Sequence, residues 1–85
     1  MDAKNTVLYV DDEETNLRIF KNTFRRDFDI FTALSAKDGL LILSENVVDV
    51  VITDQRMPEI TGVEFLKIVN EQFPNIPPNR LIVSG

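Results

Sequence analysis

Cysteine and histidine are both absent from this chain of 85 residues. Without thiols the chain has no disulfide and no thiolate metal site, a composition typical of a reducing cytoplasm. Without imidazoles it has neither histidine metal ligands nor a catalytic triad that depends on histidine. Any chemistry must therefore depend on carboxylates, hydroxyls and cations.

Positive charge and long apolar runs are also scarce. The chain has 9 lysines and arginines against 14 aspartates and glutamates, which gives a net charge of −5 at pH 7. Because phosphate neutralisation needs clustered basic side chains, we expect no direct binding of nucleic acid by this chain. No apolar run is long enough to cross a bilayer, and the N-terminal residues MDAKNT lack the apolar core of a signal peptide. We therefore expect a cytoplasmic protein with no membrane association.

Short β-branched runs alternate with segments whose apolar residues recur every three or four positions. The runs predict strands, and the spaced segments predict amphipathic helices. We predict strands at 6–10, 28–32, 47–53 and 80–84, and helices at 14–26, 36–45 and 62–73. The connections are long enough for right-handed crossovers, so the order predicts an α/β fold with a mostly parallel sheet and helices on both faces.

Three of the predicted strands end in oxygen-bearing side chains. Asp11 and Asp12 follow the first strand, Asp54 follows the third, and Ser84 ends the fourth. Ligands of open α/β sheets bind outside the carboxyl ends of the strands, so these groups are candidates for one site. Carboxylates that share a site repel one another without a cation, and oxygen ligands alone favour Mg²⁺. A carboxylate beside such an ion can act as a nucleophile toward a phosphoryl group.

Each of these residues also has a simpler interpretation when it is taken alone. Asp11 and Asp12 are suited to cap the helix that follows them and to interact with its dipole. Asp54 is suited to form a loop in which its side chain hydrogen-bonds the nearby backbone, as an Asx residue does. Ser84 on its own is an ordinary surface hydroxyl. The coincidence of all of them at the strand ends of one sheet favours a common site.

Three segments together resemble the receiver domain of two-component response regulators. LYVDDEETNLRIF is similar to that family's first strand, acidic pair and first helix. VVITDQRMPEITGVEFL resembles its phosphoacceptor segment, with the Asp-x-x-Met-Pro-x-x-x-Gly spacing, and LIVSG resembles its fourth strand. The resemblance implies a flavodoxin-like parallel sheet of order 2-1-3-4. The family's fifth strand and last helix are missing, so residues 1–85 are expected to form a partial receiver domain, truncated after the fourth strand.

The resemblance also implies a role for each candidate residue. Asp54 would accept a phosphoryl group from a sensor histidine kinase or phosphotransfer protein. Mg²⁺ would be held by Asp11, Asp12, Asp54 and the backbone carbonyl of Arg56. Ser84 would be the switch hydroxyl that bonds the phosphoryl group.

The missing fifth strand has further implied consequences. In this family that strand ends in a lysine that pairs with the phosphoryl group, so we expect impaired phosphorylation chemistry in this chain. The exposed fourth strand is expected to promote self-association. An effector domain is expected on the C-terminal side in the full-length protein, as part of a bacterial-type signalling system.

Other functions remain open at this point. A receiver-like interaction domain that is never phosphorylated would have the same fold. A haloacid dehalogenase-like phosphatase also uses aspartate and Mg²⁺, but its nucleophile lies on strand one in an Asp-x-Asp pattern, whereas Asp11 and Asp12 are adjacent. A dinucleotide binder needs a glycine-rich turn after the first strand, and none follows it here. We therefore predict a phosphoacceptor signalling domain, which promotes only its own phosphorylation and is not an enzyme.

Overall fold

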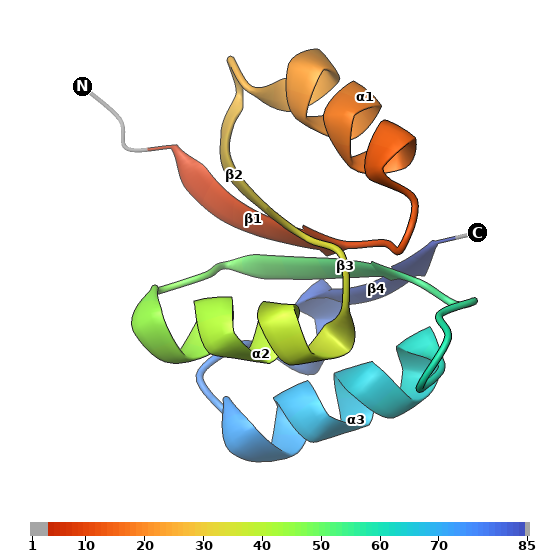
Figure 1. The fold of residues 1–85 in the computed structure, drawn as a ribbon. Coiled ribbons are helices and arrows are strands. Elements are labelled where there is room, and N and C mark those ends of the chain that lie inside the picture. The colour runs from red at the N-terminus through yellow and green to blue at the C-terminus, as the bar shows by residue number, and fades with distance from the viewer. Residues whose placement is uncertain (1–3, 85) are drawn as a thin grey trace.

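The computed structural model describes residues 4–84 and contains a parallel sheet with helices on both faces (Figure 1). The strands are β1 (Asn5–Val10), β2 (Phe28–Ala33), β3 (Val50–Asp54) and β4 (Leu81–Ser84). The helices are α1 (Glu14–Phe24), α2 (Ala36–Glu45) and α3 (Gly62–Gln72), and a 3₁₀ turn, Pro78–Arg80, precedes β4. The strand order is β2-β1-β3-β4, and every pair is parallel. This confirms the predicted fold class and strand order.

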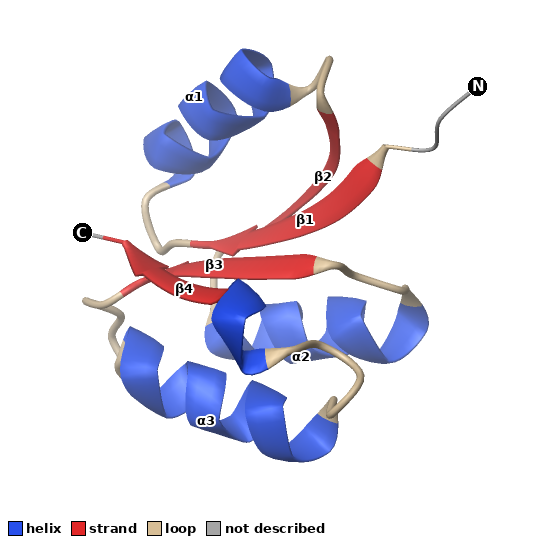
Figure 2. Cartoon of the chain, turned by 180° about the vertical axis from the view of Figure 1, so that it is seen from behind, coloured by secondary structure: helices blue, strands red, loops and turns tan. Residues whose placement is uncertain are grey.

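The helices are divided between the two faces of the sheet. α1 lies on one face, and α2 and α3 cover the other (Figure 1 and Figure 2). The division follows from right-handed crossovers, because the chain moves from β1 outward to β2 and then back across β1 to β3. The strand order therefore reverses between β1 and β3, which is the place where open α/β sheets bind ligands.

The hydrophobic core lies between the sheet and the layer formed by α2 and α3. The largest apolar side chains with no exposed surface come from β1, β3 and α3; they are Leu8, Val10, Val51, Phe65 and Val69. Gly39 in α2 lets that helix approach them closely. A Cβ atom at Gly39 would lie 2.9 Å from Val10 Cγ2 and 3.1 Å from Phe65 Cζ. The close packing of α2 against the core therefore depends on glycine, which has no side chain, at position 39.

β3 begins at Val50, so the predicted start at residue 47 is wrong. Val47 is 87% exposed and lies in the connection from α2. Asp49 explains the late start, because its side-chain Oδ2 accepts a hydrogen bond from the backbone N–H of Thr6 at 2.8 Å. Its own N–H donates to the Thr6 carbonyl at 2.8 Å. A side chain thus replaces a backbone acceptor at this point, and the regular ladder begins one residue later.

α1 ends at Phe24, two residues before the predicted end at residue 26. The N–H of Arg25 donates to the Lys21 carbonyl at 2.9 Å, and the N–H of Asp27 donates to the Phe24 carbonyl at 3.0 Å. This tight turn leads the chain directly into β2. The other differences between the predicted and observed ends of strands and helices are of one residue.

Within residues 4–84, no helix combines the length and the apolar character that a membrane crossing requires.

α3 begins beside the carboxyl end of β3 and is held there by a capping box. Thr61 Oγ1 accepts from the N–H of Glu64 at 3.1 Å, and the Glu64 carboxylate accepts from the N–H of Thr61 at 2.9 Å. The hydrogen bond from the Thr61 backbone, with a further one from its side chain, holds the pKa of Glu64 below its usual value of 4.5. A Cβ atom at Gly62 would lie 2.5 Å from the Asp54 carbonyl oxygen, so this close approach requires glycine.

β4 is an edge strand of the sheet and pairs with β3. Two of its apolar side chains are partly open to solvent, with Ile82 44% exposed and Val83 39% exposed. An unpaired strand edge with apolar side chains is a surface on which another strand can pair.

Candidate functional site

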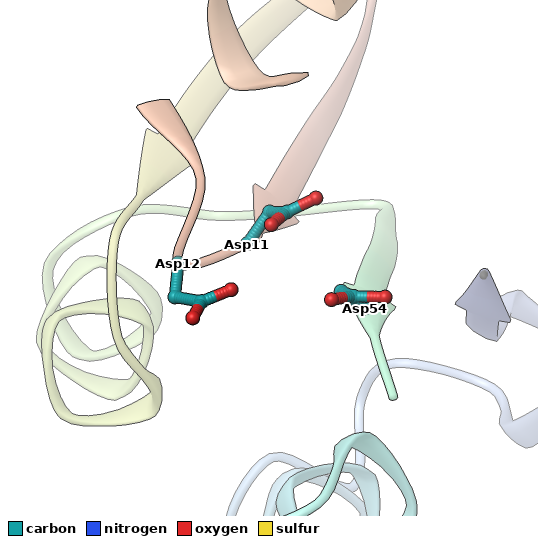
Figure 3. Close-up of side chains that lie close together, drawn as sticks. All are labelled: Asp11, Asp12 and Asp54. Carbon is teal, nitrogen blue, oxygen red and sulfur yellow. The ribbon is translucent and has the colours of Figure 1, made fainter. Parts of the chain in front are cut away.

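Three carboxylates meet at the carboxyl edge of the sheet, from two neighbouring strands (Figure 3). Asp11 and Asp12 directly follow β1, and Asp54 is the last residue of β3. The parallel pairing of β1 with β3 brings these strand ends together. One oxygen atom from each side chain lies within 4.8 Å of the others. The structure therefore gathers the three acidic residues that the sequence singled out.

The three carboxylates differ in their exposure to solvent. Asp11 is 2% exposed, Asp54 is half-buried and Asp12 is exposed. A buried carboxylate is costly unless hydrogen bonds replace its water. Asp11 has three such bonds, and their donors lie in β1, in the turn before α1 and in α1 itself. It is therefore the most firmly held member of the cluster.

The hydrogen bonds of Asp11 use both of its oxygen atoms. Oδ1 accepts from the backbone N–H of Glu13 at 2.9 Å. Oδ2 accepts from the Tyr9 hydroxyl at 2.8 Å and from the Asn16 side-chain amide, through Nδ2, at 3.1 Å. Burial raises the pKa of the Tyr9 phenol, and the hydrogen bond to Asp11 and the nearby carboxylate charges raise it further, so the phenol stays neutral well above physiological pH. A neutral phenol is the form that donates to a carboxylate.

Among residues 4–84, no ion pair balances the charge of the cluster. In the stretch from residue 4 to residue 84 the ion pair that forms is Arg18 with Glu14, at 3.7 Å on the exposed face of α1. No lysine or arginine of that stretch forms an ion pair with the three carboxylates. Carboxylates held this close favour a bound cation, and a set of oxygen ligands suits a hard divalent ion such as Mg²⁺.

The loop after Asp54 is tied to the start of α3. The carbonyl of Gln55 accepts from the N–H of Gly62 at 3.0 Å, and Gln55 Oε1 accepts from the N–H of Val63 at 3.0 Å. The side chain of Met57 packs against the core. Arg56 lies between these anchored residues, two positions after Asp54, with its side chain exposed. The hydrogen bonds of Gln55 on one side and the packing of Met57 on the other restrict the path of the Arg56 backbone.

Ser84 lies at the same edge of the sheet as the carboxylates. In the register of β3 and β4 it is the direct partner of Asp54. Its side chain is exposed. The structure thus places this hydroxyl-bearing residue on the strand next to Asp54.

Two residues at the site were missed by the reasoning from sequence, namely Tyr9 and Asn16. Alternation along a strand could have indicated Tyr9, because residues two positions apart point to the same face. Asn16 gave no such signal, because its contact with Asp11 depends on how the turn Asp12–Glu13 leads into α1. Both donate to the buried carboxylate and neither belongs to the acidic cluster.

A parallel sheet in this order, with a carboxylate cluster where the strand order reverses, defines a flavodoxin-like α/β protein. Residues 7–84 match the family described as the response regulator receiver domain, and the chain belongs to that family. Receiver domains are signalling domains of bacterial two-component systems, as predicted from the sequence.

Individual proteins agree with this assignment. The hydrogenase transcriptional regulatory protein HoxA of Cupriavidus necator is 42% identical over 84 residues, which cover 99% of this chain and 17% of HoxA. A receiver domain protein from Clostridium thermocellum has a TM-score of 0.81 and 32% identity, covering 93% of this chain and 63% of that chain. The response regulator TrrA of Thermotoga maritima, solved in complex with Mg²⁺-BeF, has a TM-score of 0.78 and 26% identity, covering 85% of this chain and 64% of TrrA. This chain therefore spans a small part of HoxA.

Proposed function

We propose that Asp54 accepts a phosphoryl group from the phosphohistidine of a sensor histidine kinase or a phosphotransfer protein. The observation that supports this most directly is the convergence of three carboxylate oxygens within 4.8 Å at the carboxyl edge of the sheet. The half-buried position of Asp54 leaves it accessible to a donor carried by another protein. The domain would promote only its own phosphorylation and would not turn over a metabolite.

The transfer requires one bond to form and one to break. A carboxylate oxygen of Asp54 would bond to phosphorus while the phosphorus–nitrogen bond of the donor breaks, and the electron pair of that bond would remain on the imidazole. The product is an acyl phosphate on Asp54. The end of β3 and the anchored loop after it would hold the carboxylate in position during the attack.

The donor set of the site fits Mg²⁺. Asp11, Asp12, Asp54 and the backbone carbonyl of Arg56 would hold the ion, since hard oxygen ligands and some retained water are what Mg²⁺ prefers. When bound, the ion would offset the negative charge of the carboxylates and of the incoming phosphoryl group. The related TrrA structure, which contains Mg²⁺, supports this choice of ion.

Ser84 would couple phosphorylation to the surface of the domain. Its register position beside Asp54 supports a hydrogen bond from its hydroxyl to a phosphoryl oxygen. That bond would draw the end of β4 toward the site. The exposed starting position of Ser84 leaves room for such a movement.

The wider setting follows from the same proposal. We expect the domain to work in the cytoplasm, where histidine kinases and phosphotransfer proteins present their phosphohistidines. An effector domain on its C-terminal side would read the change, which agrees with the small share of HoxA that this chain spans. HoxA is a transcriptional regulatory protein, so one class of effector that fits this proposal is a domain that regulates transcription.

The test is the addition of phosphate to the protein in its full-length form. Incubation with a small-molecule phosphodonor and Mg²⁺ should add one phosphate, seen by mass spectrometry, and chelation of Mg²⁺ should prevent the addition. Asp54→Asn should abolish it, while Asp29→Asn, at an exposed position of β2, should not. If no adduct forms under these conditions, the domain is instead an interaction module that is not phosphorylated. Release of phosphate from simple esters would indicate a phosphatase.

A further inference from the structure

We infer that Tyr9 and Asn16 are positioning residues for the metal site, because their hydrogen bonds occupy one oxygen of Asp11 and leave the other to face a cation. Neither residue belongs to the acidic cluster, yet both contact its buried member. The inference rests on the proposed function, because it concerns how the site would hold its ion.

The assignment follows from the lone pairs of the Asp11 carboxylate. Each carboxylate oxygen offers about two lone-pair positions. Oδ2 accepts from the Tyr9 hydroxyl at 2.8 Å and from Asn16 Nδ2 at 3.1 Å, so both of its positions are used. Oδ1 accepts from the N–H of Glu13 alone, at 2.9 Å, and keeps one position free. Asp11 is therefore prepared to offer a single oxygen, either directly or through a bound water.

The Tyr9 hydroxyl is held in place by aromatic packing. The ring of Tyr9 lies against Phe20, with the ring centroids 4.7 Å apart. Phe20 in turn packs on Phe24 at 4.9 Å, so the phenol rests on a row of rings along α1. Asn16 belongs to the same helix. α1 thus supplies one donor to Asp11 directly and supports the ring that carries the other.

A single available oxygen matters for the choice of ion. Mg²⁺ requires near-octahedral geometry and uses few protein ligands, whereas Ca²⁺ accepts a carboxylate through both oxygens and in flexible geometry. Removing a donor from Oδ2 would free that oxygen and loosen the carboxylate. The site would then lose affinity for Mg²⁺ more than for Ca²⁺. A merely structural role for Tyr9 would not change this preference.

The test is the affinity of the chain and its variants for Mg²⁺ alone and for Ca²⁺ alone, measured by isothermal titration calorimetry. Tyr9→Phe keeps the ring and removes the hydroxyl, and Asn16→Ala removes the amide. Each should weaken Mg²⁺ binding about tenfold, the lower end of what loss of such a supporting hydrogen bond costs, and should weaken Ca²⁺ binding less. Thr23→Val is the matched control, because the Thr23 hydroxyl bonds the Ile19 carbonyl within α1 and not the site. It should change neither affinity.

Three results would overturn the inference. One is an unchanged Mg²⁺ affinity in Tyr9→Phe and Asn16→Ala. Another is an equal loss for both ions, which would indicate general damage to the fold. The third is a loss in Thr23→Val as large as that in Tyr9→Phe. Failure of the proposed function would look different, because the full-length protein would then gain no phosphate even where the unmodified chain binds Mg²⁺.

Discussion

The repulsion between the three carboxylates should lower the stability of the metal-free fold, and its size can be worked out from the structure. Asp54 is far in sequence from Asp11 and Asp12, so their charges meet only in the folded state. The three contributing oxygens lie within 4.8 Å of one another. At such a distance a pair of like charges repels by about 1 kcal/mol in water and by about 3 kcal/mol at an effective dielectric constant of about 20. Asp54→Asn removes two such pairs, one with Asp11 and one with the exposed Asp12, so even at the value for water it should stabilise the metal-free fold by about 2 kcal/mol.

Bound Mg²⁺ should offset this difference in stability. An ion that binds only the folded state at a concentration a hundred times its dissociation constant stabilises that state by about 2.7 kcal/mol. The unmodified chain should gain this amount, and Asp54→Asn should gain little because it lacks one ligand. In a domain of this size about 1 kcal/mol shifts the melting temperature by roughly 4–8 °C. Without Mg²⁺ the variant should therefore melt higher, and with saturating Mg²⁺ the unmodified chain should recover the difference.

The assay is urea or thermal unfolding of both chains with Mg²⁺ and with a chelator. Asp29→Asn is the control for net charge, because it also removes one negative charge but lies at an exposed position of β2. Its stability should change little in either condition. The reasoning is refuted if metal-free Asp54→Asn is no more stable than the unmodified chain, or if Mg²⁺ stabilises both by the same amount.

Three further outcomes are expected. Gly62→Ala should destabilise the fold by about 1–3 kcal/mol and weaken Mg²⁺ binding, because its new Cβ would meet the Asp54 backbone; Gly39→Ala meets only side chains and should leave Mg²⁺ affinity unchanged. The lowered pKa of Glu64 means that its contribution to stability is present above its usual pKa of 4.5 and is lost as pH falls through the lower folded value. Urea unfolding of Glu64→Gln across that range should therefore show a weaker dependence on pH, and an unchanged dependence would contradict the capping role. Sedimentation of the 85-residue chain should show association that grows with concentration and is reduced by Ile82→Lys, whereas a monomer at every concentration would exclude pairing through β4.

Local patterns were sufficient to predict most of the fold. Strands and helices differ in the spacing of their apolar residues, and this spacing can be read without knowing which strands pair. The start of β3 could not be predicted in this way. Val47 continues the β-branched run, yet it is exposed because the Asp49 side chain bonds Thr6 before the ladder begins. That bond joins residues 43 positions apart, which no local pattern reports.

The sequence by itself determined which side chains stand at the ends of the strands. Asp11, Asp12 and Asp54 each follow an apolar run, and once parallel strands are assumed, their shared edge follows. Only the tertiary structure decided which of the three is buried and what holds it. Asn16 donates to Asp11 because the turn after β1 places the first turn of α1 beside that carboxylate. Phe20 of α1 packs on the ring of Tyr9, whose hydroxyl is another donor to Asp11. This placement of α1 against β1 is a property of the assembled layers and not of any single segment.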